Sequence, residues 1–134
     1  MPQGSCFCGN VKISYEGDAL ATVVCHCMAC RKISGSAFST NILVPSVTIL
    51  SGSTKTVVRV ADSGQTIHSH ICGDCGSTLW LTGEKFGDNV IVQAGVLDDE
   101  GAVEAAKPAI EQYITRRPGW IAPVDEANQF EASF

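Results

Sequence analysis

The chain has 134 residues, of which 45% are hydrophobic and 17% are charged, and its formal net charge at pH 7 is −5. This length suits one domain around one core, and the composition is too apolar for a disordered chain. The basic residues cluster no further than the pairs Arg31-Lys32 and Arg116-Arg117, so a surface that binds nucleic-acid phosphates is not expected.

The N-terminal residues have neither the basic segment nor the apolar segment of a secretory signal peptide. No apolar run is long enough to span a bilayer. We therefore expect a cytoplasmic protein that does not bind membranes. Thiols are kept reduced in the cytosol, so clustered cysteines in such a protein indicate metal or redox chemistry rather than disulfides.

Short strands dominate the predicted elements. Seven segments have the alternating or β-branched pattern of strands: residues 11–15, 38–44, 47–50, 54–61, 66–71, 77–81 and 90–96. Turn residues separate these segments, for example Pro45 and the Ser51-Gly52-Ser53 run. Many short strands at close spacing predict a mainly β fold with antiparallel sheets.

Helical signal is confined to a few short turns. Residues 27–33 are predicted to form one or two helical turns that end at Gly35, and residues 103–107 another turn that ends before Pro108. Residues 109–115 follow as a late strand. The acidic tail from Arg117, which proline and glycine interrupt, is expected to lie on the surface and to end against the fold through Phe130 or Phe134.

Seven cysteines fall into three groups along the chain. The groups are Cys6-Phe7-Cys8-Gly9, Cys25-His26-Cys27-Met28-Ala29-Cys30 and Cys72-Gly73-Asp74-Cys75-Gly76. Because the number is odd, a framework made only of disulfides leaves one thiol over. The grouping into two, three and two is typical of metal ligands.

Zinc explains this spacing in physical terms. Tetrahedral zinc binds thiolates at about 2.3 Å, so neighbouring sulfurs lie roughly 3.8 Å apart. A C-x-x-C turn delivers two sulfurs at that separation, and a C-x-C on a strand places both side chains on one face. We expect Gly73 and Gly76 to permit positive φ, which lets backbone N–H groups point at sulfur.

Seven ligands divide naturally into four and three. The preferred partition joins the two short, remote motifs into one closed structural site, made of Cys6, Cys8, Cys72 and Cys75. The triplet Cys25, Cys27 and Cys30 then holds a second zinc whose fourth position is open, which is the layout of a catalytic site. With one protein ligand fewer, the second site is expected to bind zinc more weakly and to be only partly occupied. A swapped pairing of the motifs remains open.

Three other uses of the thiols compete with zinc. Free buried cysteines pack as small hydrophobes, but scattered core thiols have no reason to group. A thioredoxin-type redox couple follows a strand and opens a helix in a βαβ unit, and the chain has no such pattern. An iron–sulfur cluster also takes thiolate ligands and stays open as a minor alternative.

The cysteine motifs resemble those of the glutathione-dependent formaldehyde-activating enzyme family, which includes centromere protein V. The matching segments are Gly4-Ser5-Cys6-Phe7-Cys8-Gly9, Cys25-His26-Cys27-Met28-Ala29-Cys30-Arg31-Lys32-Ile33-Ser34-Gly35-Ser36-Ala37-Phe38, Cys72-Gly73-Asp74-Cys75-Gly76-Ser77 and Arg117-Pro118-Gly119-Trp120. They extend over about residues 4–120, so the whole chain, residues 1–134, is expected to be a single zinc-binding domain of this type.

The resemblance implies a fold and an activity. The fold is a β-tent, in which β-sheets fold over the metal sites, with a structural zinc on Cys6, Cys8, Cys72 and Cys75 and a catalytic zinc on Cys25, Cys27 and Cys30. The family's activity joins formaldehyde to glutathione, giving S-hydroxymethylglutathione. The chain departs from the family pattern at Ile71, where an aromatic residue is usual, and at Glu111, where a histidine is common.

Residues next to the triplet are candidates for binding the thiol cosubstrate. Arg31 and Lys32 are placed to hold a carboxylate, and Ser34 and Ser36 to line the site through hydroxyls and backbone N–H groups. Each has a structural alternative, which is a solvated helix face for the two cations and a helix cap and turn for the two serines.

The histidines and tryptophans are also ambiguous. His26, between two cysteines, is a candidate proton shuttle or fourth metal ligand, or else a packed imidazole. His68 and His70 share one face of a predicted strand and are either metal ligands or ordinary strand residues. Trp80 and Trp120 are expected in the core or in a pocket wall.

These features favour one reaction class. A zinc held by three thiolates is a soft centre that suits binding and exchange of a further thiol, whose pKa it lowers. The resulting thiolate attacks an aldehyde to give a hemithioacetal. We therefore expect a zinc-dependent carbon–sulfur lyase with a small thiol, such as glutathione, and an aldehyde, such as formaldehyde, as partners. A non-catalytic zinc module that binds a protein is the alternative, and a redox thiol sensor is a third.

Overall fold

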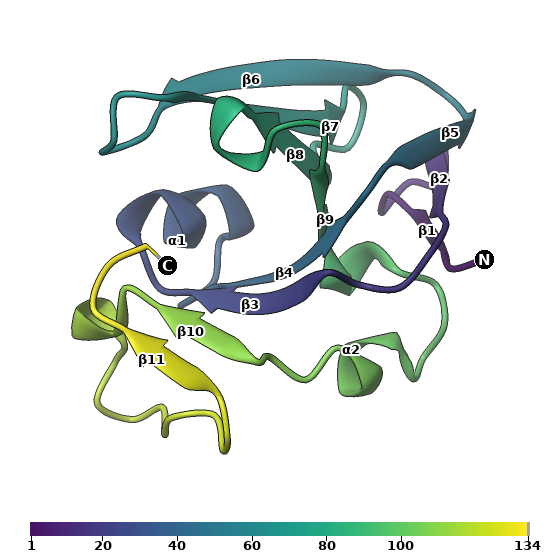
Figure 1. Cartoon of the computed structure of the whole chain (residues 1–134). Helices are drawn as coiled ribbons and strands as arrows, with labels where there is room; N and C mark the ends of the chain where they lie inside the picture. Colours follow the sequence, from purple (N-terminus) through teal and green to yellow (C-terminus); the bar gives the residue numbers. More distant parts are fainter. Residues whose placement is uncertain (134) are drawn as a thin grey trace.

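The computed structural model describes residues 1–133, which form two β-sheets and several short helices (Figure 1). The elements in chain order, with η for 3-10 helices, are β1 (Gln3–Ser5), β2 (Lys12–Tyr15), β3 (Ala21–Cys25), α1 (Met28–Ser34), β4 (Ser39–Val44), β5 (Val47–Ser51), β6 (Thr54–Val60), β7 (Thr66–Cys72), β8 (Thr78–Gly83), η1 (Glu84–Phe86), β9 (Val90–Gln93), η2 (Ala94–Val96), α2 (Ala102–Ala105), β10 (Ile110–Gln112), η3 (Ile114–Arg116) and β11 (Asn128–Phe130). Within residues 1–133, no helix has the length and apolarity needed to cross a membrane.

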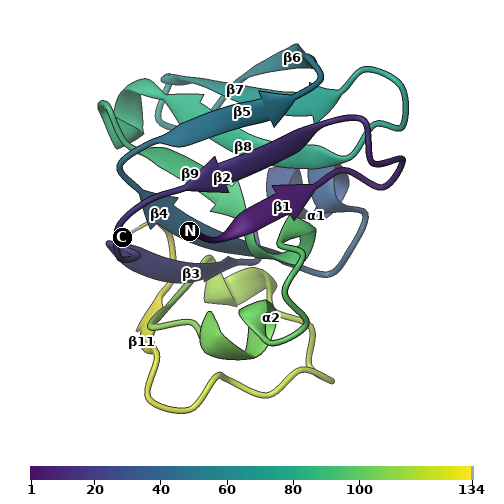
Figure 2. The same ribbon diagram turned by 90° about the vertical axis from the view of Figure 1, so that its right-hand side faces the viewer.

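The two sheets differ in size and are stacked face to face. The smaller has the strand order β1-β2-β5, and the larger has the order β11-β10-β3-β4-β9-β8-β7-β6. Figure 2 shows the smaller sheet lying in front of strands of the larger one. Strand pairing is antiparallel except at one edge, where β10 runs parallel to both β3 and β11. The mainly β fold expected from the sequence is confirmed, with this parallel edge added.

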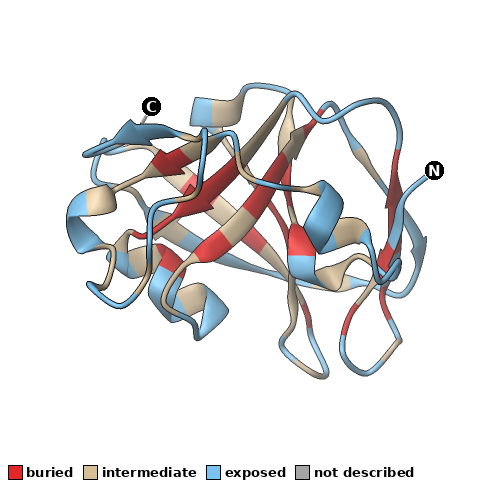
Figure 3. Ribbon diagram, turned by 90° about the horizontal axis from the view of Figure 1, so that it is seen from below, coloured by how far each residue is buried: buried red, intermediate tan, exposed pale blue. Residues whose placement is uncertain are grey.

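The main core fills the space between the sheets. Ile13 and Tyr15 alternate along β2 and pack against a buried cluster from the larger sheet that includes Ile42, Val44 and Val92. Full burial of a side chain of this kind stabilises a fold by about 1.5–3 kcal/mol. In Figure 3 the buried residues follow the central strands, whereas the loops and short helices are largely exposed.

The opposite face of the larger sheet carries a second, smaller apolar cluster. Ile67, Leu81 and Ile91 are buried there, with Leu43 and Phe86 packed against them. The register explains the grouping, because Leu43 and Leu81 both lie opposite Ile91 on neighbouring strands. The sheet curves around this face, and α1 lies within the curve, between β3–β4 and β6–β8 (Figure 1).

The predicted helical turns are found where the sequence indicates them. Helix α1 begins one residue later than expected because Cys27 is its N-cap, with an extended backbone and a sulfur that accepts from the Cys30 N–H. Gly35 ends the helix in the left-handed conformation, with φ of 64°. Helix α2 occupies most of the second predicted turn and ends before Pro108.

Two predicted strands are shorter than expected. The strand predicted over residues 90–96 ends at Gln93, where its pairing with β4 stops, and continues as η2. The strand predicted over residues 109–115 keeps only Ile110–Gln112, because Tyr113 adopts a left-handed conformation with φ of 56°. The sequence analysis missed β1 and β11, which have three residues each, and also β3.

Candidate functional site

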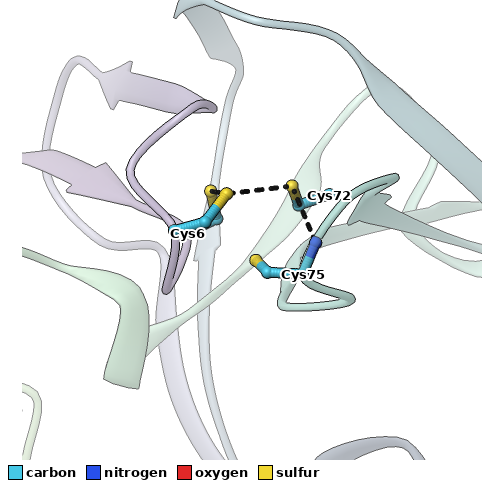
Figure 4. Close-up of side chains that lie close together, drawn as sticks. Cys6, Cys72 and Cys75 are labelled. Carbon is cyan, nitrogen blue, oxygen red and sulfur yellow. Dashed lines mark hydrogen bonds between the residues drawn. The ribbon is translucent and has the colours of Figure 1, made fainter.

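Four cysteines from two distant loops converge where the two sheets meet. Cys6 and Cys8 lie in the loop between β1 and β2, whereas Cys72 ends β7 and Cys75 lies in the turn that follows. All four sulfurs lie within 4.8 Å of one another, with 3.5 Å between Cys6 and Cys8 and 3.7 Å between Cys8 and Cys72. Figure 4 shows Cys6 facing Cys72 and Cys75 across the gap between the loops. These separations are close to the roughly 3.8 Å edge of a tetrahedral zinc–thiolate site.

The two loops present their sulfurs with equivalent turns. The Gly9 N–H donates to the Cys6 carbonyl at 3.0 Å, and the Gly76 N–H donates to the Cys72 carbonyl at 2.9 Å. Gly9 and Gly76 have φ of 83° and 79°, a conformation that side chains disfavour. Gly73 was also expected there but does not have positive φ.

Backbone N–H groups point at sulfur in both turns. The Val11 N–H donates to Cys6 Sγ at 3.2 Å, and the Cys75 N–H donates to Cys72 Sγ at 3.5 Å. Ser77 joins the loops, because its Oγ accepts from the Phe7 N–H at 2.9 Å and lies 3.3 Å from Cys75 Sγ. Hydrogen bonds from Ser77 lower the pKa of Cys75 to about 5. A backbone hydrogen bond from Asn10 lowers the pKa of Cys8, but contacts with Cys6 and the other thiols outweigh it and raise that pKa to about 12. Four thiolates this close therefore need a cation among them.

The remaining three cysteines form a second cluster at the junction of β3 and α1. Cys25 ends β3, Cys27 caps α1, and Cys30 lies in the first helical turn. Their sulfurs lie within 4.8 Å of one another. Cys25 and Cys30 are buried, and Cys27 is partly exposed. The Cys30 N–H donates to Cys27 Sγ at 3.3 Å, which orients the second sulfur toward the other two.

The three thiols of this triplet differ in their readiness to ionise. Hydrogen bonds from Cys25 and Cys30 lower the pKa of Cys27 to about 2. Contacts with Cys25 and Cys27 raise the pKa of Cys30, and the contact with Cys27 raises that of Cys25. Three thiolates this close repel one another, so complete ionisation needs a cation among them. A divalent metal that binds thiolates fits this donor set.

His26 is fully buried and contacts Glu111 and Phe38. Its Nε2 donates to Glu111 Oε2 at 2.8 Å, and its ring packs edge-on against Phe38. Its Nδ1 has no hydrogen-bond partner among residues 1–133. Within that part of the chain, His26 is not a member of either cluster of potential metal ligands. The geometry therefore matches the packed imidazole that the sequence left as an alternative.

Glu111 is the buried centre of a hydrogen-bond network behind the triplet. Its carboxylate accepts from the Val124 N–H at 2.6 Å, from Gln129 at 3.0 Å, from His26 at 2.8 Å and from Arg117 at 3.2 Å. Burial alone raises the pKa of Glu111, but these hydrogen bonds outweigh it and lower the pKa to about 2. The network connects the C-terminal tail to the loop that bears the cysteines.

A cavity of about 530 Å³ opens beside the triplet, on the curved face of the larger sheet. Its wall includes Cys25, Cys27 and Cys30 and none of the other four cysteines. Most of the lining surface is apolar, and the second hydrophobic cluster described above supplies part of it. A cavity of this size and character is typical of a site for a small molecule.

The polar groups of the cavity come from segments far apart in the sequence. Arg59 of β6, Lys85 of η1 and Arg116 of η3 are its cations, and Asp62 is its acid. Tyr113 also lines the cavity, directly after β10. Burial, followed by the charges of Asp62 and the cysteines, raises the pKa of Tyr113, so its phenol stays protonated near neutral pH.

The substrate-binding residues proposed from the sequence lie outside this cavity. Arg31, Lys32, Ser34 and Ser36 are exposed and are not among the residues that line it. Arg31 Nη1 contacts Met28 Sδ at 3.1 Å. Ser34 Oγ donates to the Cys30 carbonyl at 2.6 Å and accepts from the Ser36 N–H at 3.2 Å, as a helix-terminal serine does.

The structure also places the other histidines and the two tryptophans. His70 stacks on Trp80 at 4.7 Å between ring centroids, and its Nε2 lies 2.8 Å from Thr82 Oγ1. Among residues 1–133, neither His68 nor His70 belongs to a cluster of potential metal ligands. Trp80 is in the core as expected, whereas Trp120 is 80% exposed and the prediction for it was wrong.

The sequence analysis missed the cavity cations and Tyr113. Arg59 occupies one alternating position of a strand, and only the pairing of Arg59 with Ile67 shows which face it is on. Lys85 and Arg116 lie in single helical turns that carry no motif. The tail is attached through the pairing of β11 with β10, which includes Phe130, and through hydrogen bonds to Glu111. Phe130 is 37% exposed, and Phe134 lies outside the described residues.

Comparisons with known proteins place the fold and the family. The crystal structure of a Rhodobacter sphaeroides protein, a Northeast Structural Genomics target, is similar with a TM-score of 0.60, covering 77% of this chain and 94% of that chain. The sequence identity is 17%, so this likeness concerns the fold alone. The family described as glutathione-dependent formaldehyde-activating enzyme matches residues 1–116, which contain all seven cysteines. The chain therefore belongs to the glutathione-dependent formaldehyde-activating enzyme family.

Proposed function

We propose that this protein is a zinc-dependent carbon–sulfur lyase that acts on adducts of a small thiol and an aldehyde. Family membership supports the reaction class, with glutathione and formaldehyde as the first substrates to test. One observation carries the proposal most directly. Only one of the two cysteine clusters opens into the cavity, and it is the cluster with three sulfurs.

In this proposal the two clusters have different roles. Cys6, Cys8, Cys72 and Cys75 supply a complete tetrahedral donor set and hold a structural zinc that joins the two sheets. Cys25, Cys27 and Cys30 leave one coordination position for a substrate. His26, the nearest other donor in sequence, is engaged with Glu111 and does not fill that position.

The chemistry then follows from the cavity. Zinc held by three thiolates supplies a soft Lewis acid at which a thiol loses its proton near neutral pH. The cosubstrate sulfur attacks the carbonyl carbon, a carbon–sulfur bond forms, and the displaced proton ends on the carbonyl oxygen as the hydroxyl of the adduct. Tyr113, whose phenol stays protonated, is the cavity residue best suited to hydrogen-bond that oxygen.

The direct test adds glutathione and formaldehyde to the zinc-loaded protein and follows exchange of the adduct by NMR. We expect exchange faster than the spontaneous reaction, and expect Cys27→Ser to abolish the acceleration while the fold is kept. If neither glutathione nor a panel of other small thiols exchanges faster with the enzyme, the lyase assignment is wrong. The zinc-binding interaction module is then the better description.

A further inference from the structure

The cavity has the opposite charge balance to the rest of the protein. The whole chain carries 14 acidic and 9 basic residues. The cavity wall instead presents Arg59, Lys85 and Arg116 against the single acid Asp62. These cations come from β6, η1 and η3, so the fold gathers them from three separate segments. Such a gathering of positive charge around an apolar cavity indicates an anionic ligand.

Of the three cations, Arg59 gives the strongest indication of an anionic ligand. It lies opposite Ile67, so its side chain shares the cavity face with the second apolar cluster. It is only partly exposed, yet among residues 1–133 its guanidinium has no hydrogen-bond or ion-pair partner. A guanidinium on an apolar wall loses hydration without gaining a partner, which is costly unless a ligand supplies one.

Arg116 and Lys85 are the more exposed cations of the cavity. Within residues 1–133, Arg116 also has no side-chain hydrogen-bond or ion-pair partner. Lys85 Nζ donates to Ser133 Oγ, and Ser133 lines the same cavity. The two arginines are therefore the groups with free donor capacity, and their planar N–H forks match a carboxylate.

We propose that Arg59 and Arg116 bind a carboxylate of the thiol cosubstrate and make the enzyme selective for anionic thiols. This inference rests on the proposed function, because it presumes that the sulfur of the same molecule binds at the triplet. It assigns recognition to β6 and η3 in place of the Arg31-Lys32 pair. The two arginines are specificity-determining residues, and the aldehyde is not their ligand.

A competing explanation is that Arg59 only compensates the negative charge of the cysteine cluster. Hydrogen bonds from Cys25 and Cys30 lower the pKa of Cys27, and the charge of Arg59 adds to that lowering. If this were its whole role, removing Arg59 would weaken the binding of every thiol equally. Recognition of a carboxylate requires a selective loss.

The test uses the cobalt-substituted protein, because the absorption bands of cobalt report a new thiolate ligand without any need for turnover. The probes are 3-mercaptopropionate, 3-mercapto-1-propanol and cysteamine, which are anionic, neutral and cationic thiols of similar size. We expect the wild type to bind the anionic thiol roughly tenfold more tightly than the neutral one, as expected for a hydrogen-bonded charge pair. Arg59→Gln combined with Arg116→Gln should bring this ratio close to one.

Matched variants show which residues cause the preference for the anionic thiol. Lys55→Gln removes a charge from the same strand and face but outside the cavity, and should leave the ratio unchanged. If Arg31→Gln with Lys32→Gln lowers the ratio instead, the anion binds at α1 and the inference is wrong. Cobalt stoichiometry and circular dichroism verify that each variant is folded and loaded.

The outcomes separate the inference from the proposed function. If the three thiols bind with equal affinity, or if the arginine variant weakens all three alike, anion selectivity is overturned while the open metal site stands. If no thiol changes the cobalt spectrum, the open site itself is wrong, and both proposals fall together.

Discussion

At the scale of single residues, Tyr113 combines an unusual backbone with a position in the cavity. It has φ of 56° and ψ of 43°, which costs a residue with a side chain about 1 kcal/mol or more relative to ordinary conformations. The same conformation ends β10 and turns the chain so that the phenol lines the cavity. Strain of this kind is common where a side chain must be aimed at a site.

Tyr113→Phe tests whether the phenol takes part in the reaction. If its O–H stabilises the developing negative charge on the carbonyl oxygen, kcat should fall by about a hundredfold or more. Metal content and thiol affinity should stay unchanged, because the ring and backbone remain. Tyr15→Phe is the matched control, since the only other tyrosine lies in the core between the sheets. A kcat for Tyr113→Phe within twofold of the wild type would remove Tyr113 from the mechanism.

A site residue could be predicted from the sequence when it belongs to a short motif, and not when its position depends on the rest of the fold. The cysteine groups are evident because a metal requires ligands at short spacing, and both clusters have the membership that the sequence indicates. Arg59 and Tyr113 have no local signal. The position of Arg59 depends on the register of β6 with β7, and that of Tyr113 depends on its own left-handed conformation. Arg31 follows the triplet directly in sequence, yet it does not line the cavity.

At the scale of elements, β10 fastens the C-terminal tail to the sheet. It pairs in parallel with β3 and β11, and Glu111 at its centre accepts hydrogen bonds from the tail residues Arg117, Val124 and Gln129. Parallel pairing at this edge brings the tail behind the cysteine triplet, because Gln112 lies opposite Cys25. The buried carboxylate is thus an anchor for the segment after residue 116.

Glu111→Gln should destabilise the protein by about 2 kcal/mol or more, because it removes a buried charge that accepts four hydrogen bonds. Glu131→Gln, an exposed change on the same tail, is the control. The folded-state pKa of about 2 lies below the usual 4.5, so the carboxylate contributes stability that is complete above pH 4.5 and lost as the pH falls toward 2. The difference in unfolding free energy between wild type and Glu111→Gln should follow that course, and a difference independent of pH from 7 to 2 would contradict it.

Strands could be predicted from the sequence where the alternating or β-branched pattern extends over several residues. Strands β4 to β8 are seen with boundaries within two residues of those predicted, because each has several alternating or β-branched positions. β1 and β11 have three residues each, which is too short for periodicity to appear. Residues 94–96 keep an apolar sequence but have no partner strand beyond Gln93, so they form η2 instead.

At the scale of the whole molecule, the two cysteine clusters differ in which segments of the chain they join. The four-cysteine cluster joins a loop of the smaller sheet to a turn of the larger one, across 64 residues between Cys8 and Cys72. The triplet lies within one strand–helix junction and joins no distant segments. Loss of metal from the first cluster should therefore separate the sheets, whereas loss from the second should leave both in place.

Unfolding of the zinc-loaded Cys75→Ser and Cys27→Ser proteins tests this division most directly. A structural zinc contributes about 10–16 kcal/mol in small zinc peptides, which matches or exceeds the total stability of a typical domain, about 5–15 kcal/mol. We therefore expect Cys75→Ser to be unfolded at 25 °C, and Cys27→Ser to melt within a few degrees of the wild type. A folded Cys75→Ser protein together with an unfolded Cys27→Ser protein would show that the structural and catalytic roles have been assigned to the wrong clusters.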